Sequence, residues 1–383
     1  MKFRSTSLKK KSPAFRFRSI RTDWGLWSPA AIVVFCLVAF HLLAGKSEGQ
    51  TSGASGRIEW LDIHVHLVGG RGSLQDYQAA IRGALGAMEE SGIRKMVVMP
   101  PPQIYGNPGN HEYDSFAEVL KRYPTRFAFL GGGGSLNPML QAANGTEVSN
   151  DLRREFEDKA NEILQRGALG FGEITAHHLS HVPGHPYESV AADHPLLLLL
   201  ADIAGRNNVL IDFHFDLVTE EMKAPEWLSS PPNPRLFRPN LAAFERLLEH
   251  NRKAKIVWAH AGSDMLGNWT IELSRRLLVR HPNLYMSLRL APGRAPQNHP
   301  LSRDNEIRPG WLQLLRDFPD RFVIGGDQFF VSPSVRGGGP GVEFSQRAPM
   351  NRERTRVFLA ALPADLSRKI ALENAIRLYR LKD

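Results

Sequence analysis

From residue 57 onward, the chain alternates short apolar segments with longer segments whose apolar residues recur every three or four positions. The short segments are typical of β-strands and the longer ones of amphipathic helices. The pattern predicts strands at residues 60–66, 95–100, 127–132, 168–174, 209–216, 255–260, 284–290 and 322–327. Among the helices predicted between them are those at residues 75–90, 151–165, 241–251 and 265–281. Alternation of this kind indicates parallel strands of the α/β class, joined by crossover helices.

Eight strands in about 327 residues predict one (β/α)8 TIM barrel rather than two separate domains. The competing fold is a doubly wound open sheet. A dinucleotide-binding sheet of that kind carries a G-x-G-x-x-G motif after its first strand, and none stands there in this chain. We therefore expect a single barrel domain over residues 57–383.

Polar side chains alternate with apolar ones along the first predicted strand. Its apolar residues are Leu61, Ile63, Val65 and Leu67, and its polar residues are Asp62, His64 and His66. Because successive strand side chains point to opposite faces, we expect the apolar set to pack on the helices and the polar set to point into the barrel.

Further polar residues stand where other predicted strands end, which is where barrel enzymes place their chemistry. They are Glu173 on the fourth strand, Asp212, His214 and Asp216 on the fifth, His260 on the sixth and Asp327 on the eighth. Burying several carboxylates requires a compensating cation. Two histidines about 6–7 Å apart along one strand can share one ion. His214 would add a nitrogen and Asp327 an oxygen. These residues predict a site for a divalent metal, with zinc as the preferred ion and an open coordination position for water.

These residues resemble those of the amidohydrolase superfamily, in particular its amidohydrolase-related branch. That branch includes aminocarboxymuconate-semialdehyde decarboxylase and pyrone-dicarboxylate lactonase. The segments that carry the resemblance are Asp62-Ile-His64-Val-His66, Gly170-Phe-Gly-Glu173, His214, Trp258-Ala-His260-Ala-Gly262, Gly325-Gly-Asp327 and Glu373-Asn-Ala-Ile-Arg-Leu-Tyr379. The resemblance extends over roughly residues 58–383.

The resemblance implies that His64, His66, His214 and Asp327 ligate the metal. It also implies that Asp327 takes a proton from water and that His260 is the acid/base or carbonyl-polarising group. Glu173 would either bridge the first ion to a second one or support the ligands without touching the metal. One ion is favoured over two. The implied function is hydrolysis of an ester, lactone or amide by activated water. Two alternatives stay open: a non-oxidative decarboxylase, and a tethered binding protein without catalysis.

Two further residues are candidates for binding a small-molecule substrate. Arg289 lies at the end of the seventh predicted strand and would hold a substrate carboxylate; its alternative role is an ordinary ion pair. His177 belongs to a histidine-rich stretch after Glu173 that also contains His178, His181 and His185. That stretch would line the pocket or be solvated. Asp62 is expected to support the histidines from behind.

The first 56 residues differ in character from the rest. Residues 1–28 hold eight Lys/Arg against one acid, Asp23, and so carry +7 of the net charge of +9. The remainder is close to neutral, which argues against a nucleic-acid partner. Residues 29–45 are apolar, and residues 46–56 form a polar Gly/Ser-rich linker. The single cysteine, Cys36, lies in the apolar segment and excludes both an intramolecular disulfide and a cysteine zinc site.

This order predicts a basic cytoplasmic segment, then a transmembrane anchor or signal-peptide core, then the linker. An uncleaved anchor is favoured over a cleaved signal, because no small-x-small site follows the apolar run. The membrane is thus an expected partner through the N-terminal segment. The barrel is expected on the periplasmic side, anchored or secreted.

Overall fold

The computed structural model describes residues 58–70, 75–104, 111–182, 184–228, 232–337 and 340–382. The predicted anchor and linker lie outside these residues. No helix among the described residues has the length and apolar character needed to cross a membrane.

Parallel strands form the wall of a closed barrel. In chain order these strands are β1 (Trp60–Val68), β2 (Ile93–Val98), β3 (Phe127–Phe129), β4 (Gly131–Gly132), β5 (Gly170–His178), β7 (Leu210–Phe215), β10 (Lys255–Ala261), β11 (Leu284–Leu288), β12 (Phe322–Ile324) and β13 (Gln328–Val331). One sheet runs β13-β1-β2-β3 and the other β12-β11-β10-β7-β5-β4. Because β3 continues into β4 and β12 into β13, the two sheets close into one barrel with eight positions around its wall. The predicted TIM barrel is confirmed.

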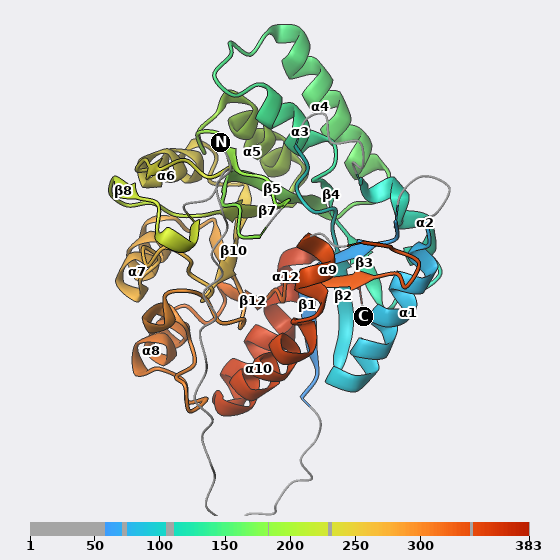
Figure 1. The fold of residues 1–383 in the computed structure, drawn as a ribbon, viewed down its shortest axis with the longest axis vertical. Coiled ribbons are helices and arrows are strands. Elements are labelled where there is room, and N and C mark those ends of the chain that lie inside the picture. Colours follow the sequence, from blue (N-terminus) through green and yellow to red (C-terminus); the bar gives the residue numbers. More distant parts are fainter. Residues whose placement is uncertain are drawn as a thin grey trace, which may run out of the picture. The chain divides into compact units, whose positions relative to one another are not determined.

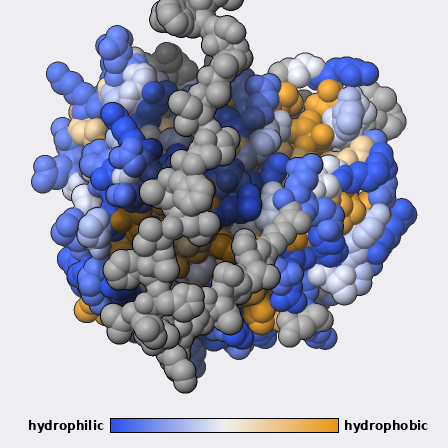
Figure 2. Space-filling view, turned by 90° about the horizontal axis from the view of Figure 1, so that it is seen from below, coloured by the Kyte–Doolittle hydropathy of each residue, from blue (hydrophilic) through white to orange (hydrophobic). Residues whose placement is uncertain are grey.

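Helices cover the outside of the wall, so the strands lie at the centre of Figure 1. The longer helices are α1 (Tyr77–Ser91), α4 (Asn150–Gln165), α5 (Pro195–Asn207), α6 (Leu241–His250), α7 (Ile271–Arg280), α8 (Pro309–Asp317) and α10 (Ala348–Ala361). Shorter elements lie between them: α2 (Ala117–Leu120), α3 (Leu136–Ala142), β6 (Glu188–Ser189), β8 (Met222–Lys223), β9 (Leu236–Phe237), α9 (Pro340–Ser345), α11 (Ala364–Arg368) and α12 (Asn374–Tyr379). On the face drawn in Figure 2, hydrophilic residues cover most of the visible surface and hydrophobic ones form separate patches.

The inside of the barrel has its own apolar cluster, which α12 completes. Its members are Leu61, Ile63, Val97, Met99, Leu130, Leu210, Val257, Val323, Ala375, Leu378 and Tyr379. They come from strands all around the wall and from the final helix. This helix therefore closes the end of the barrel opposite to the strand ends that carry the polar residues.

The alternation predicted for the first strand is wrong over its first half. Leu61 and Ile63 belong to the inner cluster, whereas Val65 and Leu67 pack in the outer core. The pairing between β1 and β2 shifts register between Asp62 and Val65. This irregularity changes the face that the apolar residues occupy, and it lets His64 follow Ile63 into the barrel.

Two other predicted boundaries differ from the structure. The helix predicted over 265–281 begins at Ile271, because the Asp264 carboxylate holds the preceding segment in a loop. That carboxylate accepts hydrogen bonds from the backbone N–H groups of Leu266, Gly267 and Trp269. The eighth strand is interrupted at residues 325–327, where it leaves β11 and joins β1.

Candidate metal centre and active site

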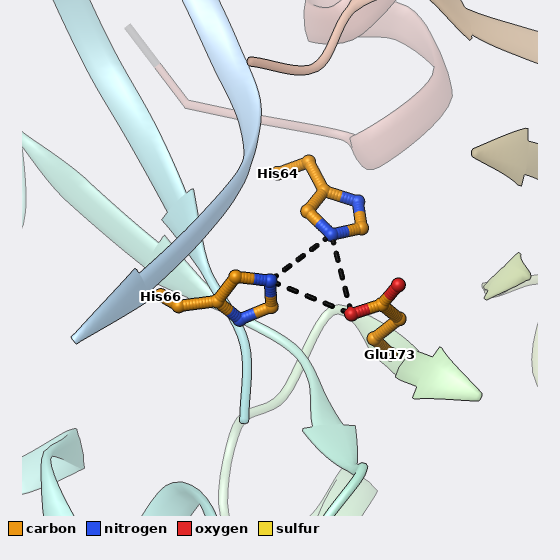
Figure 3. A group of neighbouring side chains, drawn as sticks. All are labelled: His64, His66 and Glu173. Atoms are coloured by element: carbon orange, nitrogen blue, oxygen red, sulfur yellow. Dashed lines mark hydrogen bonds and ion pairs between the residues drawn. The ribbon is translucent and has the colours of Figure 1, made fainter. Parts of the chain in front are cut away.

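The two histidines of β1 face a common point (Figure 3). Their Nε2 atoms lie 3.2 Å apart, and neither ring is exposed to solvent. His66 Nδ1 lies 3.0 Å from the carbonyl oxygen of Met99, and His64 Nδ1 lies 3.1 Å from Asp212 Oδ1. The Met99 carbonyl oxygen can only accept a hydrogen bond, so His66 Nδ1 carries the proton and its Nε2 presents a lone pair. The ion-pair contact with Asp212 favours a proton on His64 Nδ1 as well.

Glu173 of β5 adds an oxygen to this pair. Its Oε2 lies 3.5 Å from His64 Nε2 and 3.4 Å from His66 Nε2. Three lone-pair atoms at such distances repel one another unless a cation lies among them. Nitrogen and oxygen donors of this kind suit a divalent transition metal, so the residues present fit the predicted ion.

The electrostatics of His64 lead to the same conclusion. Burial alone lowers the pKa of this ring, but the carboxylates of Asp212 and Glu173 outweigh burial and raise the pKa well above its ordinary value. A buried position that draws a proton onto a ring is one that attracts positive charge.

Glu173 also takes part in a second group of donors through its other oxygen. Its Oε1 lies 2.8 Å from His214 Nδ1 and 3.4 Å from His260 Nε2, and these two nitrogens are 3.0 Å apart. His64, His66 and Glu173 thus form one set with metal-binding geometry, and Glu173, His214 and His260 form another. Glu173 is therefore the residue that connects His214 to His64 and His66.

Asp327 lies at the edge of the first set. Its Oδ1 is 3.4 Å from His66 Nε2 and 4.0 Å from His64 Nε2, and its Oδ2 is 3.1 Å from Arg289 Nη2. Burial would raise the pKa of Asp327, but the Arg289 guanidinium and the nearby histidines hold it well below its usual value. Arg289 is therefore the ion-pair partner of a predicted ligand and stands beside the centre.

Backbone conformation singles out the same positions. His260 and Asp327 have φ angles of 70° and 50°, in the left-handed region that non-glycine residues rarely adopt. His260 lies in β10 beyond the last residue paired with β7, and Asp327 lies between β12 and β13. Such conformations persist where the surrounding structure imposes them, often at active sites.

Two buried carboxylates support the centre from behind. Asp62 accepts hydrogen bonds from Gly326 N at 2.8 Å, from His64 N at 3.2 Å and from the side chain of Gln328. It thereby joins β1 to the segment that carries Asp327, in the supporting role predicted for it. Asp212 orients His64, a contact that the sequence pattern did not predict because it depends on the strand register across the barrel.

A small hollow of about 20 Å³ opens beside His214 and His260, and its wall includes Asp216, Ser263 and Trp269. His177 is buried near this region. Its Nδ1 lies against the carbonyl oxygen of Asp216, and its Nε2 is 3.4 Å from Tyr187 Oη. Its neighbour His178 packs on His214 instead, with ring centroids 4.2 Å apart.

Comparison with known proteins agrees with this geometry. A model of the amidohydrolase family matches residues 62–381. No protein with a curated description matches the chain.

Several solved structures share similarity with the chain. An uncharacterised TIM-barrel protein from Bordetella bronchiseptica is 17% identical, with 85% of this chain and 99% of that one covered and a TM-score of 0.48. A probable 2-pyrone-4,6-dicarboxylic acid hydrolase from Acinetobacter baumannii, with citric acid bound, is 12% identical (84% and 100% covered, TM-score 0.48). A dihydroxybenzoic acid decarboxylase from Polaromonas, with manganese and 2-nitroresorcinol, is 14% identical (84% and 97% covered, TM-score 0.45).

The family match spans far more than half of the chain and contains all the donors described above. The chain belongs to the amidohydrolase family and is a metal-dependent enzyme of that superfamily.

Proposed function

We propose that this protein is a metal-dependent hydrolase that opens an ester, lactone or amide bearing a carboxylate group. One observation carries the proposal. Two histidine lone pairs and a carboxylate oxygen converge within 3.5 Å, buried at the mouth of a barrel. Beside them stand a neutral histidine and an arginine.

The proposed site holds one zinc ion. His64, His66, His214 and Asp327 would be its ligands, and Glu173, which contacts all three histidines, would lie beside them. When bound, a divalent ion lowers the pKa of water toward 7 and polarises a carbonyl oxygen.

His260 is suited to act on the carbonyl oxygen of the substrate. Burial lowers the pKa of this histidine to about 4, although its hydrogen bond with Glu173 opposes the shift. The ring is therefore neutral at neutral pH and can donate one N–H to an oxygen that gains negative charge.

Asp327 is proposed to accept the proton that the attacking water loses. Its Oδ2 is engaged by Arg289, so Oδ1 is the oxygen that faces the histidines. The low pKa of Asp327 keeps its carboxylate ionised at neutral pH, so Oδ1 would be available to accept a proton.

Arg289 and the hollow beside His260 define the proposed substrate side. The arginine is a permanent cation close to the centre and can bind a carboxylate while it pairs with Asp327. His177 would line the same side of the mouth.

A non-oxidative decarboxylase is the second candidate, and Arg289 also supports it. A carboxylate held by this cation next to His260 would lie where a proton donor can replace carbon dioxide on the substrate carbon. The reaction products distinguish the two candidates. Hydrolysis yields an acid with an alcohol or amine, whereas decarboxylation releases carbon dioxide.

The test measures metal content and turnover on the full-length chain. The parent, His64→Ala and the control His250→Ala are analysed by elemental mass spectrometry. They are then assayed with esters, lactones, amides and free carboxylic acids, with carbon dioxide recorded separately. His250 is a matched control because it lies on α6 and pairs with Asp202 at the surface.

About one equivalent of zinc is expected in the parent and the control, and His64→Ala should lose both metal and turnover. Full metal and full turnover in His64→Ala would refute the assigned centre. Two equivalents in the parent would show that the set of Glu173, His214 and His260 also binds an ion.

A further inference from the structure

A buried arginine on α10 donates hydrogen bonds to two neutral side chains, and the proposed function leaves it unused. Arg352 is only 8% exposed. Its Nε donates to Ser91 Oγ at the end of α1 (3.1 Å), and its Nη1 donates to Gln328 Oε1 (2.9 Å). Because arginine is rarely buried without a negative partner, the charge of Arg352 requires a carboxylate beyond these two contacts.

Gln328 links this cation to a buried carboxylate. It is the first residue of β13 and is only 1% exposed. Its Oε1 accepts from Arg352, and its Nε2 donates to Oδ2 of Asp62, which is fully buried. The direction of the amide is fixed, because a guanidinium has no acceptor atom. Arg352, Gln328 and Asp62 thus form a relay of hydrogen bonds that runs one way, from α10 to β1.

At the end of this relay, Asp62 holds the two residues on either side of Asp327. Its Oδ1 accepts from Gly326 N at 2.8 Å, and its Oδ2 accepts from the side chain of Gln328. Asp327 lies between them with a φ of 50°, a conformation that persists where the surrounding structure imposes it. The grip of one carboxylate on both neighbours supplies this constraint. It keeps Asp327 Oδ1 at 3.4 Å from His66 Nε2.

We propose that Gln328 and Arg352 are positioning residues for Asp327, and that their relay sets how tightly the centre holds its metal. Arg352 orients Gln328, Gln328 orients Asp62, and Asp62 fixes the backbone on both sides of the ligand. The inference rests on the proposed function in one respect, which is that Asp327 is a metal ligand.

The direction of the relay gives a test that separates it from general packing. In Gln328→Glu, a new carboxylate faces the carboxylate of Asp62, so the contact becomes repulsive. In Asp62→Asn, two amides stand in series between Arg352 and the N–H of Gly326. Both ends of the series are donors, so one contact is lost whichever way the amides turn.

The double variant Asp62→Asn/Gln328→Glu restores every contact and keeps the net charge. Its new carboxylate can accept from Arg352 and from the new amide, and the oxygen of that amide can still accept from Gly326 N. A relay that acts through its hydrogen bonds is therefore repaired by combining two harmful changes. A site that depends only on packing is not.

The experiment compares the parent with these three variants and with Arg352→Met, all as full-length chains. Competition with a chromophoric chelator measures zinc affinity, and the absorption spectra of the cobalt-loaded chains report the geometry of the ligands. Denaturant unfolding of the metal-free chains separates lost affinity from lost stability. Arg356→Met is the matched control, because Arg356 lies on the same helix and pairs with Glu353 at the surface.

Gln328→Glu and Asp62→Asn should each bind zinc about tenfold to a hundredfold more weakly, the usual effect of losing a group behind a metal ligand. Arg352→Met should lose about tenfold, and the control should match the parent. The double variant should lie within about threefold of the parent, because its two changes compensate within one network. Its cobalt spectrum should also return to that of the parent.

Parent-like affinity in Gln328→Glu would overturn the proposal. Losses that simply add in the double variant would overturn it as well. If Arg352→Met does not fold, the two single variants and the double variant decide the matter on their own.

A second arm needs no metal. A parent that binds no zinc would be a failure of the proposed function alone, and amide hydrogen exchange of the metal-free chains then tests the relay. Exchange at Gly326 should be at least about tenfold faster in Gln328→Glu than in the parent, the effect of losing one buried hydrogen bond, and slow again in the double variant. Amides of α5 serve as the internal reference. An unchanged rate at Gly326 in Gln328→Glu would show that the relay does not hold this backbone.

Discussion

At the scale of single residues, the centre depends on which nitrogen of each histidine carries the proton. The Met99 carbonyl oxygen and the Asp212 carboxylate fix this for His66 and His64. Neither partner is a metal donor itself. Each turns a ring that could adopt either tautomer into one with its lone pair aimed at the centre.

Replacing Asp212 by Asn should therefore weaken metal binding without removing any donor. We expect zinc affinity to fall about tenfold to a hundredfold, the usual effect of losing a carboxylate behind a histidine ligand. Competition with a chromophoric chelator measures this affinity, and Asp202→Asn should leave it unchanged. Parent-like affinity in Asp212→Asn would show that Met99 and Glu173 suffice to orient the pair.

The buried Glu188 predicts a pH dependence of stability. Its pKa is about 8 in the folded chain against an ordinary 4.5, so the folded state binds more protons than the unfolded state between these values. The free energy of unfolding contributed by this group therefore falls as pH rises from about 5 to 8. Glu188→Gln removes the titration and should gain stability relative to the parent, by more at pH 8 than at pH 5. Thermal unfolding at both pH values measures the difference, and an equal gain at both would contradict the assignment.

At the scale of elements, the eighth strand changes its pairing partner from β11 to β1 at residues 325–327, beside the candidate metal donors. Glycines make the change sterically feasible. A Cβ built on Gly325 would lie 2.0 Å from Ser287 Oγ and 3.0 Å from His64 Cβ. The close approach of these strands brings Asp327 to the histidines of β1.

Gly325→Ala should consequently disturb both stability and the centre. We expect a loss of about 1–3 kcal/mol in the free energy of unfolding, as for other overpacked cores, together with weaker zinc binding. Gly86→Ala on α1 is the matched control, because a Cβ there meets nothing within 4 Å. The control should be neutral or slightly stabilising. Denaturant unfolding and chelator competition give the two readouts, and a Gly325→Ala chain as stable as the parent would contradict the packing argument.

The strands could be predicted from the sequence because each is a short apolar run followed by polar residues at its C-terminal end. The donors His64, His66, His214, His260 and Asp327 could be recognised for the same reason. What could not be predicted depends on pairing between distant segments. The contact of Asp212 with His64 and the register shift within β1 arise from neighbouring strands. The contact of Glu188 with His178 requires the β5–β6 hairpin, for which a two-residue strand gives no periodic signal.

At the scale of the whole molecule, the candidate active site lies at one end of the barrel. Helix α12 closes the other end. Tyr379 is buried in the inner apolar cluster, and within the described part of the chain its hydroxyl has no hydrogen-bond partner. The ring therefore contributes by filling space rather than by polar contact.

Truncating this ring should cost far more than removing its hydroxyl. Tyr379→Ala is expected to lower the free energy of unfolding by about 3–5 kcal/mol, as for other large aromatic residues in cores. Tyr379→Phe should be neutral or stabilising, because it removes an unsatisfied polar atom. Denaturant titration compares the two variants. A Phe variant as unstable as the Ala variant would reveal a hydrogen bond to the hydroxyl, for example from an ordered water.

The N-terminal segment gives a prediction about location. Its basic residues precede an apolar run, so we expect the chain after residue 56 to lie on the periplasmic side. A reporter enzyme that is active only in the periplasm, fused after residue 56, should be active. Replacing the basic residues of the first 28 with neutral ones should reduce that activity. A silent fusion to the parent segment would contradict the proposed topology.

The separation of the candidate donors along the chain has a consequence for when a metal site can form. A ribosome releases β1, with His64 and His66, long before it releases Asp327, and α12 follows Asp327 in the chain. During synthesis, His64 and His66 therefore precede the strands that complete the barrel around them. The full set of candidate donors exists only after the segment with Asp327 has been made. If the chain is transported before it folds, the metals of the destination compartment, not those around the ribosome, are the ones that meet the complete set.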